Sequence, residues 1–352
     1  MSTSAATNGS GLAGVPADQY ARASRAAEAV LYDGYLLRPA SRRSAHNHRP
    51  RHVGVLTPQV WAQENLPLDT GVDGAVESWF ARSEVVAECP SGTSLTVRLR
   101  FLQPQRRSVE RYVAGTGFVP AQRLDVGGWH VTNADEVIPH ERDVTVDVSA
   151  LLREPVDVIV DAIGSTELEI VRDGSGAVRG RIRRSCRPVQ VRLSLGAADA
   201  GLVVSMVRLR VVVENVTDGV DADLSSAIAA QQSVVSTHWF LGLSDGGFVS
   251  LLDPPLWAVD ATAECANIHS FPVLAGEGGR DDLMLCAPVV LADYPRAEPR
   301  TLGDELDAAG AEPSAVPPAL PAPITPATYP AGSLESSAPA RWVVLRPAAS
   351  AF

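Results

Sequence analysis

The stretch from Ser236 to Trp257 constrains the fold more than any other part of the chain. It reads STHWFLGLSDGGFVSLLDPPLW, with apolar runs on both sides of the turn-like residues Ser244–Gly247. Asp and Gly accept the positive φ values that a tight turn needs. Pro254 and Pro255 cannot donate the hydrogen bonds that would continue a strand. The sequence therefore predicts a buried β-hairpin that ends abruptly at Asp253.

The rest of the sequence also favours strands over helices. Glu167–Val171 and Ala177–Ile182 flank a turn at Asp173–Gly176 and predict a second hairpin. Val189–Leu195 and Leu202–Val213 are expected to pair, because a short Gly- and Ala-rich connection separates them. The pattern shows no alternation of strands with helices. We therefore predict a mainly β protein, either a sandwich or a partly closed barrel.

Only one or two short helices are predicted. The alanine-rich stretch Ala17–Val30 favours one helix, and Asp223–Val235, with Asp223 as N-cap, favours a second. His52–Ala62 is expected to be a strand. After about Ala308 a Pro/Ala/Ser-rich tract cannot bury enough apolar surface to fold, so it is expected to be a disordered tail. The expected regions are a disordered leader (1–15), a helix with the basic segment and first strand (16–80), a β-rich body (81–307) and the tail (308–352).

The composition excludes several kinds of function. All 30 basic residues are arginine, so no lysine is present for a Schiff base or a P-loop phosphate site. The net charge of −11 argues against general nucleic-acid binding. No apolar run is long enough to span a bilayer, and the first residues lack the pattern of a secretion signal. The four cysteines lie far apart and form no CxxC pair, which argues against a zinc or iron–sulfur site. We expect a cytoplasmic protein with reduced thiols. We also expect no cofactor.

The densest cluster of basic side chains is the segment from Arg38 to His52, RPASRRSAHNHRPRH. Arginine offers two parallel donors to a carboxylate or phosphate, so the segment predicts a docking surface for an acidic partner or an anionic ligand. One alternative is a solvated basic loop. Another is a Zn²⁺ or Ni²⁺ site formed by His46, His48 and His52, although the neighbouring arginines would repel a cation. The residues predicted to bind a protein partner are Tyr32, Tyr35, Arg38, Arg42, Arg43, Asn47, Arg49 and Arg51.

A hydrolase-like enzyme is the alternative to a binding protein. Its candidate catalytic groups are His238 with Asp253 or Asp293. The sequence contains no GxSxG nucleophile elbow, and a histidine on a buried strand more often belongs to the core. Both aspartates precede prolines at strand ends, where they can cap backbone N–H groups. They can instead form an acidic rim that pairs with arginines such as Arg38 and Arg42.

Three blocks of this sequence resemble one protein family. The first is AVLYDGYLL at Ala29–Leu37, followed by GVL at Gly54–Leu56; the second runs from STH to DPP at Ser236–Pro255; the third is Leu283–Asp307. They resemble an uncharacterised family encoded in [NiFe]-hydrogenase gene clusters of high-G+C bacteria. The residues that the resemblance highlights are Tyr32, Gly34, Tyr35, Asn47, His238, Gly247, Phe248, Asp253, Pro254, Pro255, Asn267, Phe271, Pro272, Asp293, Tyr294, Pro295, Gly303 and Asp304.

The resemblance implies a non-enzymatic accessory protein of [NiFe]-hydrogenase biogenesis or assembly. Such a protein is expected to bind a hydrogenase subunit or a maturation factor. The chain departs from the family at Arg38-Pro39, where an aromatic stretch is usual. It departs again after Asp307, where the Pro/Ala-rich tail replaces an acidic segment and its helix.

Overall fold

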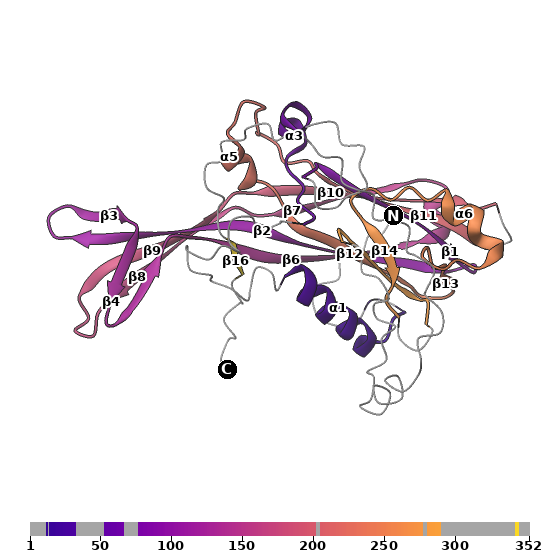
Figure 1. Cartoon of the computed structure of the whole chain (residues 1–352), viewed down its shortest axis with the longest axis horizontal. Helices are drawn as coiled ribbons and strands as arrows, with labels where there is room; N and C mark the ends of the chain where they lie inside the picture. The colour runs from indigo at the N-terminus through magenta and orange to yellow at the C-terminus, as the bar shows by residue number, and fades with distance from the viewer. Residues whose placement is uncertain are drawn as a thin grey trace, which may run out of the picture.

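The fold is a sandwich of two β-sheets, as predicted (Figure 1). The computed structural model describes residues 12, 14–32, 53–66, 77–201, 205–276 and 280–289, and the backbone of 342–344. The five-stranded sheet has the order β13 (Gly247–Phe248), β1 (Phe80–Glu88), β11 (Met206–Asn215), β10 (Val189–Asp199) and β7 (Val156–Ala162). The main path of the nine-stranded sheet is β14 (Phe271–Leu274), β15 (Leu283–Ala287), β12 (Val235–Leu243), β2 (Ser94–Val113), β6 (Ala134–Asp147) and β16 (Trp342–Val344).

The main core lies between the two sheets. Successive side chains of a strand point to opposite faces, so each strand contributes every second residue to it. Leu99 and Phe101 of β2 and Trp239 of β12 meet Val85 of β1 and Val211 of β11 in one buried cluster. This shared cluster joins the sheets into a single body.

Helix α1 (Ala17–Leu31) covers the other face of the nine-stranded sheet (Figure 1). Tyr20, Ala23 and Ala27 recur every three or four residues and so form one apolar stripe. The stripe packs in a second buried cluster with residues of the sheet such as Phe240. The helix predicted near the N-terminus is therefore confirmed, and its apolar stripe packs on the nine-stranded sheet.

The nine-stranded sheet continues beyond the sandwich as an arm, at the left of Figure 1. In the arm, the 20-residue strand β2 pairs with β3 (Gly117–Ala121) and β9 (Val178–Cys186), so the arm is an extension of the nine-stranded sheet. A small core of Val109, Leu124 and Ile182 fills the space beneath the hairpin of β4 (Arg123–Val126) and β5 (Trp129–Thr132). The arm also contains β8 (Ser165–Arg172).

The hairpin predicted within Ser236–Trp257 is wrong. β12 is a buried strand as expected, but Gly247–Phe248 pairs with Ala87–Glu88 of β1 in the other sheet. The turn, in which Gly246 has a φ of 84°, is therefore a crossover between the sheets. The N–H of Phe248 donates to the carbonyl oxygen of Asp281 at 2.7 Å. Turn chemistry predicts where the chain reverses, but it does not decide which strand the next segment pairs with.

The other two predicted strand pairs are confirmed. β8 pairs with β9 around the turn at Asp173–Gly176, and β10 pairs with β11 in antiparallel register. In the first turn, the Asp173 carboxylate accepts from the N–H groups of Ser175 and Ala177, at 2.9 and 3.1 Å. An aspartate that bonds its own backbone is the local feature that makes such a turn predictable.

The strand predicted over His52–Ala62 is wrong over most of its length. Leu56 forms only isolated bridges, one of them to Val234, and helix α3 (Gln59–Asn65) begins directly after Pro58. Proline suits the start of a helix, where no N–H donor is needed. The apolar residues here therefore serve a bridge and a helical turn.

The helix predicted over Asp223–Val235 is shorter than expected. α5 covers Ser226–Ala230, with Ser225 in place of Asp223 as the N-cap residue, and Val235 already begins β12. The remaining helices within the described residues are α4 (Val148–Leu151), the 3₁₀ helix η2 (Leu256–Ala258) and α6 (Val259–Ala263). None of the helices that the structure describes is both long and apolar enough to cross a membrane.

Two predicted regions fall mainly outside the described residues. They are the leader, of which only residues 12, 14 and 15 are described, and the Pro/Ala-rich tail, of which only the backbone of 342–344 is described. This short piece of the tail forms β16, which runs parallel to residues 135–137 of β6.

Candidate functional site

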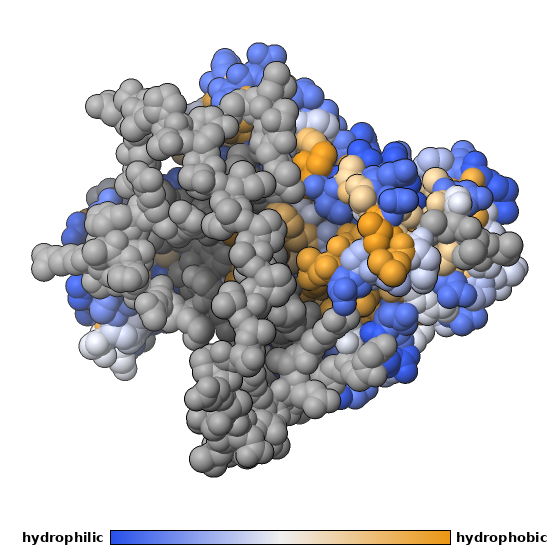
Figure 2. Space-filling model, turned by 45° about the vertical axis from the view of Figure 1, so that its right-hand side comes forward, coloured by the Kyte–Doolittle hydropathy of each residue, from blue (hydrophilic) through white to orange (hydrophobic). Residues whose placement is uncertain are grey.

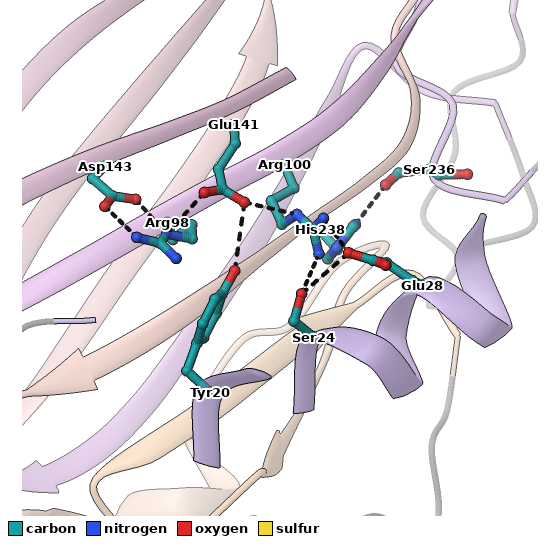
Figure 3. Close-up of polar contacts among 9 residues, drawn as sticks. All are labelled: Tyr20, Ser24, Glu28, Arg98, Arg100, Glu141, Asp143, Ser236 and His238. Carbon is teal, nitrogen blue, oxygen red and sulfur yellow. Dashed lines mark hydrogen bonds and ion pairs between the residues drawn. The ribbon is translucent and has the colours of Figure 1, made fainter. Parts of the chain in front are cut away.

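A layer of paired charges lies between α1 and the outer face of the nine-stranded sheet (Figure 3). Arg98 and Arg100 alternate along β2 with residues of the core, so they point to the opposite face. The strand register places them beside Asp143 and Glu141 of β6. The ionic layer, as we call it, consists of Tyr20, Ser24, Glu28, Arg98, Arg100, Glu141 and Asp143.

Arg98 binds both oxygens of one carboxylate. Its Nε and Nη2 donate to Oδ1 and Oδ2 of Asp143, each at 2.6 Å, and its Nε lies 3.4 Å from Glu141 Oε1. Its guanidinium lies 4.5 Å from the ring centroid of Tyr20. Burial opposes the positive charge, but the hydrogen bond to Asp143 and the other partners raise the pKa of Arg98 above its ordinary value. Arg98 therefore stays charged and contacts α1 through Tyr20.

Arg100 joins three elements of secondary structure. Its Nη2 donates to Glu28 Oε1 at 2.6 Å, and its Nη1 donates to Ser24 Oγ at 2.9 Å, both on α1. Its Nε lies 3.2 Å from Glu141 Oε2 on β6. Its guanidinium lies 5.2 Å from the ring centroid of Tyr32. The layer thus fixes α1 to the sheet by charge as well as by apolar packing.

His238 is fully buried on β12, directly opposite Arg100. Its Nδ1 donates to the carbonyl oxygen of Ser236 at 2.7 Å, and its ring meets the ring of Tyr32 edge-on, with centroids 5.5 Å apart. Burial, reinforced by the charge of Arg100, lowers the pKa of His238 to about 3. The imidazole is therefore neutral near pH 7 and does not supply a proton as a general acid.

Three consecutive residues at the start of β12 hold two distant parts of the chain. Ser236 has a φ of 54° at a bulge of the strand, and its Oγ donates to the carbonyl oxygen of Leu31, the last residue of α1, at 2.9 Å. The N–H of Ser236 donates to the carbonyl oxygen of Val53, and the N–H of Thr237 donates to that of Gly54, each at 3.0 Å. The β12 clamp, as we call this site, consists of Ser236, Thr237 and His238.

Gly54 fits against the clamp because it has no side chain. Its φ is 59°, a conformation that residues with a Cβ rarely adopt. A Cβ at this position would lie 2.9 Å from the nitrogen of Thr237 and 2.8 Å from Cγ of Pro288. The close approach of two backbones therefore accounts for the glycine of the GVL block.

Three of the buried polar atoms without hydrogen bonds lie at the clamp. Within the described residues, Tyr32 Oη, Thr237 Oγ1 and His238 Nε2 have no hydrogen-bond partner. Each such atom costs ~1–3 kcal/mol, and native proteins contain few of them. We therefore regard the clamp as the best candidate for a functional site in the part of the chain that the structure describes.

The clamp lies at both ends of the predicted basic segment. Tyr32, upstream of Arg38, is buried against His238, and the carbonyl oxygen of Val53, directly after His52, accepts from the clamp. Tyr32 is the one predicted partner-binding residue that the structure describes. The remaining residues predicted to bind a partner or a metal, and the candidate catalytic Asp293, lie outside the described residues; they are Tyr35, Arg38, Arg42, Arg43, His46, Asn47, His48, Arg49, Arg51, His52 and Asp293.

The structure does not bring His238 and Asp253 together as a catalytic pair. His238 is buried beneath α1, whereas Asp253 is exposed in the loop that follows β13. The carboxylate of Asp253 makes no hydrogen bond or ion pair with any described residue. The loop is instead fixed by the N–H of Asp253, which donates to Ser250 Oγ at 3.1 Å. Neither the hydrolase-like pair nor a capping role for this carboxylate finds support in these contacts.

Cys265 and Cys286 do not resemble activated nucleophiles. Burial raises the pKa of Cys265 to about 11 and that of Cys286 to about 12, so both are protonated thiols near pH 7. Among the residues that the structure describes, no three His, Cys, Asp or Glu side chains are grouped closely enough to hold a metal ion.

Two residues highlighted by the family resemblance have structural roles. Asn267 Oδ1 accepts from the N–H of Glu84 at 2.9 Å, and its Nδ2 donates to the Glu84 carbonyl oxygen at 3.3 Å, so this amide completes the edge of β1. A Cβ on Gly247 would collide with the carboxylate of Asp281. These contacts explain the residues by backbone packing and require no chemistry.

The ionic layer was not predicted from the sequence, although a signal for it is present. In SLTVRLRF and HERDVTVD, charged residues occupy alternate positions of long β runs. Strands with charges at alternate positions normally face solvent on that side. Pairing Arg98 with Asp143 and Arg100 with Glu141 requires the register of β2 on β6, which local patterns do not provide.

No protein-family model matches this chain, and no curated protein matches its sequence.

Proposed function

We propose that this protein is a non-enzymatic accessory protein that acts in the cytoplasm by binding a protein partner. The partner class follows from the resemblance described above: a [NiFe]-hydrogenase subunit or a maturation factor. The observation that carries the proposal is the β12 clamp, which bonds Leu31, upstream of the basic segment, and Val53, directly after it. A segment fixed at both ends loses less conformational entropy on binding than a free one.

The chemistry of the basic segment favours an acidic partner surface. The segment supplies Arg38, Arg42, Arg43, Arg49 and Arg51 within fifteen positions. Arginine binds carboxylates through two parallel donors, and a cluster of arginines speeds association with an acidic surface at low ionic strength. The ionic layer supports this role indirectly, because it holds α1 and Tyr32 at the entry to the segment.

The contacts of the described residues argue more for binding than for catalysis. The buried histidine is neutral and bonded to a backbone carbonyl, and the buried arginines are bound to carboxylates. These groups stabilise the fold in their present arrangement. The hydrolase-like alternative has no described pair of groups within hydrogen-bonding distance to support it.

Copurification with defined partners tests the proposal. The full chain is coexpressed with the tagged [NiFe]-hydrogenase large subunit of the same genome, and separately with each hydrogenase maturation factor. We expect one of these proteins to retain the wild-type chain and to lose it when Arg42, Arg43, Arg49 and Arg51 are all changed to Ser. A control variant carries Arg123→Ser and Arg172→Ser, two exposed arginines of the arm. Retention no greater than that of an unrelated acidic protein contradicts the proposal.

A further inference from the structure

Four large apolar side chains are exposed together at the end of the molecule opposite the arm. Leu256 is 95% exposed, Leu252 61%, Trp257 56% and Val259 41%. All four lie within eight residues that run from the loop after β13 through η2 into α6. Figure 1 shows α6 at this end of the sandwich, and Figure 2 turns that side forward, where apolar groups reach the surface among hydrophilic ones. We call these four residues the apolar tip.

The tip is anchored to the sandwich, although its large side chains are exposed. Ala258 and Ala261, on the opposite side of the same short helices, are buried with Val86 of β1 and Met206 of β11. Pro255 restricts the backbone just before η2. Exposure of Leu256 and its neighbours is therefore a consequence of how the segment is anchored, and stability of the fold does not require these side chains to be large and apolar.

The charges around the tip indicate the chemistry of its partner. Asp253, Asp260 and Glu264 are exposed beside the apolar residues. Glu264 pairs with Arg208, whereas Asp253 and Asp260 make no ion pair with a described residue. Their negative charge complements a basic rim on a partner and repels an anionic lipid surface. Tryptophan is enriched among the residues that dominate binding energy at protein interfaces, which also favours a protein as the partner.

We propose that the apolar tip inserts into an apolar groove with a basic rim on the partner protein. The proposal rests on the proposed function for the identity of the partner, and it assigns a contact separate from the basic segment. Two surfaces of opposite charge on one chain would fix the orientation of the partner as well as its affinity. Because the backbone of the tip is already anchored by Ala258 and Ala261, its ordering on binding costs little.

Binding of purified proteins tests the proposal with matched variants. The full wild-type chain is compared with the variant Leu256→Ser/Trp257→Ser and with the control Ile163→Ser, which alters a side chain that is 80% exposed elsewhere. The probes are the hydrogenase large subunit and the maturation factors, measured by biolayer interferometry. We expect at least a tenfold loss of affinity for the tip variant, no loss for the control, and unchanged melting temperatures for both.

A photo-crosslinking amino acid at position 257 provides a measurement that does not depend on the identity of the partner. In the source cells, we expect one protein adduct from position 257, none from position 163, and direct binding of that protein when purified. If the adduct is a protein unrelated to hydrogenases, the tip inference stands and the proposed function fails. If a hydrogenase protein binds the tip variant as tightly as the wild type, the tip inference fails and the proposed function stands.

Other occupants of the tip are outcomes that overturn the proposal. Sedimentation velocity would reveal a dimer that the tip variant loses, which would assign the tip to a second copy of this chain. Cosedimentation with phosphatidylcholine–phosphatidylglycerol vesicles, lost in the tip variant, would assign it to lipid. The absence of any adduct from position 257 would also overturn it.

Discussion

Replacing Arg100 by Met is expected to loosen α1 from the sheet. The Arg100 side chain is 9% exposed, and its loss leaves Glu28 and Glu141 without their nearest cation. Breaking a fully buried ion pair by removing one partner costs ~3–5 kcal/mol. The two carboxylates here are 41% and 36% exposed and can regain water, so we expect a smaller loss of about 2–3 kcal/mol in the free energy of unfolding.

Urea denaturation followed by circular dichroism and tryptophan fluorescence measures this loss. The matched control is Arg123→Met, which removes an ion pair between side chains that are 55% and 61% exposed. Such exposed pairs contribute about 0–1 kcal/mol. Arg100→Lys should lie between Met and the wild type, because it restores charge but not the planar fork of donors. If Arg100→Met and Arg123→Met destabilise the protein equally, the ionic layer does not hold α1.

Three further outcomes follow from the structure. Because burial lowers the pKa of His238 to about 3, the unfolded chain binds a proton that the folded chain does not. Stability should therefore fall as pH drops below about 6.5, by up to ~1.4 kcal/mol per pH unit. His238→Asn should flatten this slope in pH-dependent urea titrations, with His140→Gln, whose pKa burial also lowers, as the comparison; a slope in His238→Asn equal to that of the wild type would show that the pKa of His238 is not lowered in the folded protein. Gly54→Ala should lower the free energy of unfolding by at least ~1 kcal/mol more than Gly115→Ala does. Both glycines have positive φ, but of the two only Gly54 would bring a Cβ against neighbouring atoms. Equal losses in urea denaturation would mean that the close backbone contact at Gly54 is unimportant. Cys286, whose thiol is fully buried with a raised pKa, should react with a disulfide reagent at pH 7.5 only in the unfolded protein, and rapid reaction of the native protein would contradict its place in the core.

Much of the β structure follows from local sequence signals, and the pairing of strands does not. The β8–β9 hairpin was predictable because Asp173 and its glycines form a turn whose hydrogen bonds are all local. The turn near Gly246 has similar chemistry, yet the strand after it joins the other sheet. That choice depends on β1 and Asp281, which are far away in the sequence.

The candidate site shows the same limit. His238 stood out in the sequence, and a core role was the favoured interpretation, but its partners could not be named. Ser236 donates to Leu31, 205 positions earlier, and Arg98 pairs with Asp143 across two strands. Such contacts arise from strand register and helix docking, so neither composition nor spacing reveals them.

The central claim is that the β12 clamp holds the chain on both sides of the basic segment, and hydrogen exchange tests it most directly. Amide exchange of peptides covering α1, residues 53–58 and residues 232–243 is followed by mass spectrometry in the wild type and in Ser236→Ala. This variant keeps the strained φ of 54° but removes the bond to Leu31. We expect faster exchange at the C-terminal end of α1 and in residues 53–58 together, with the β8–β9 hairpin unchanged. Exchange that accelerates in α1 alone, or nowhere, would contradict a clamp that couples the two ends.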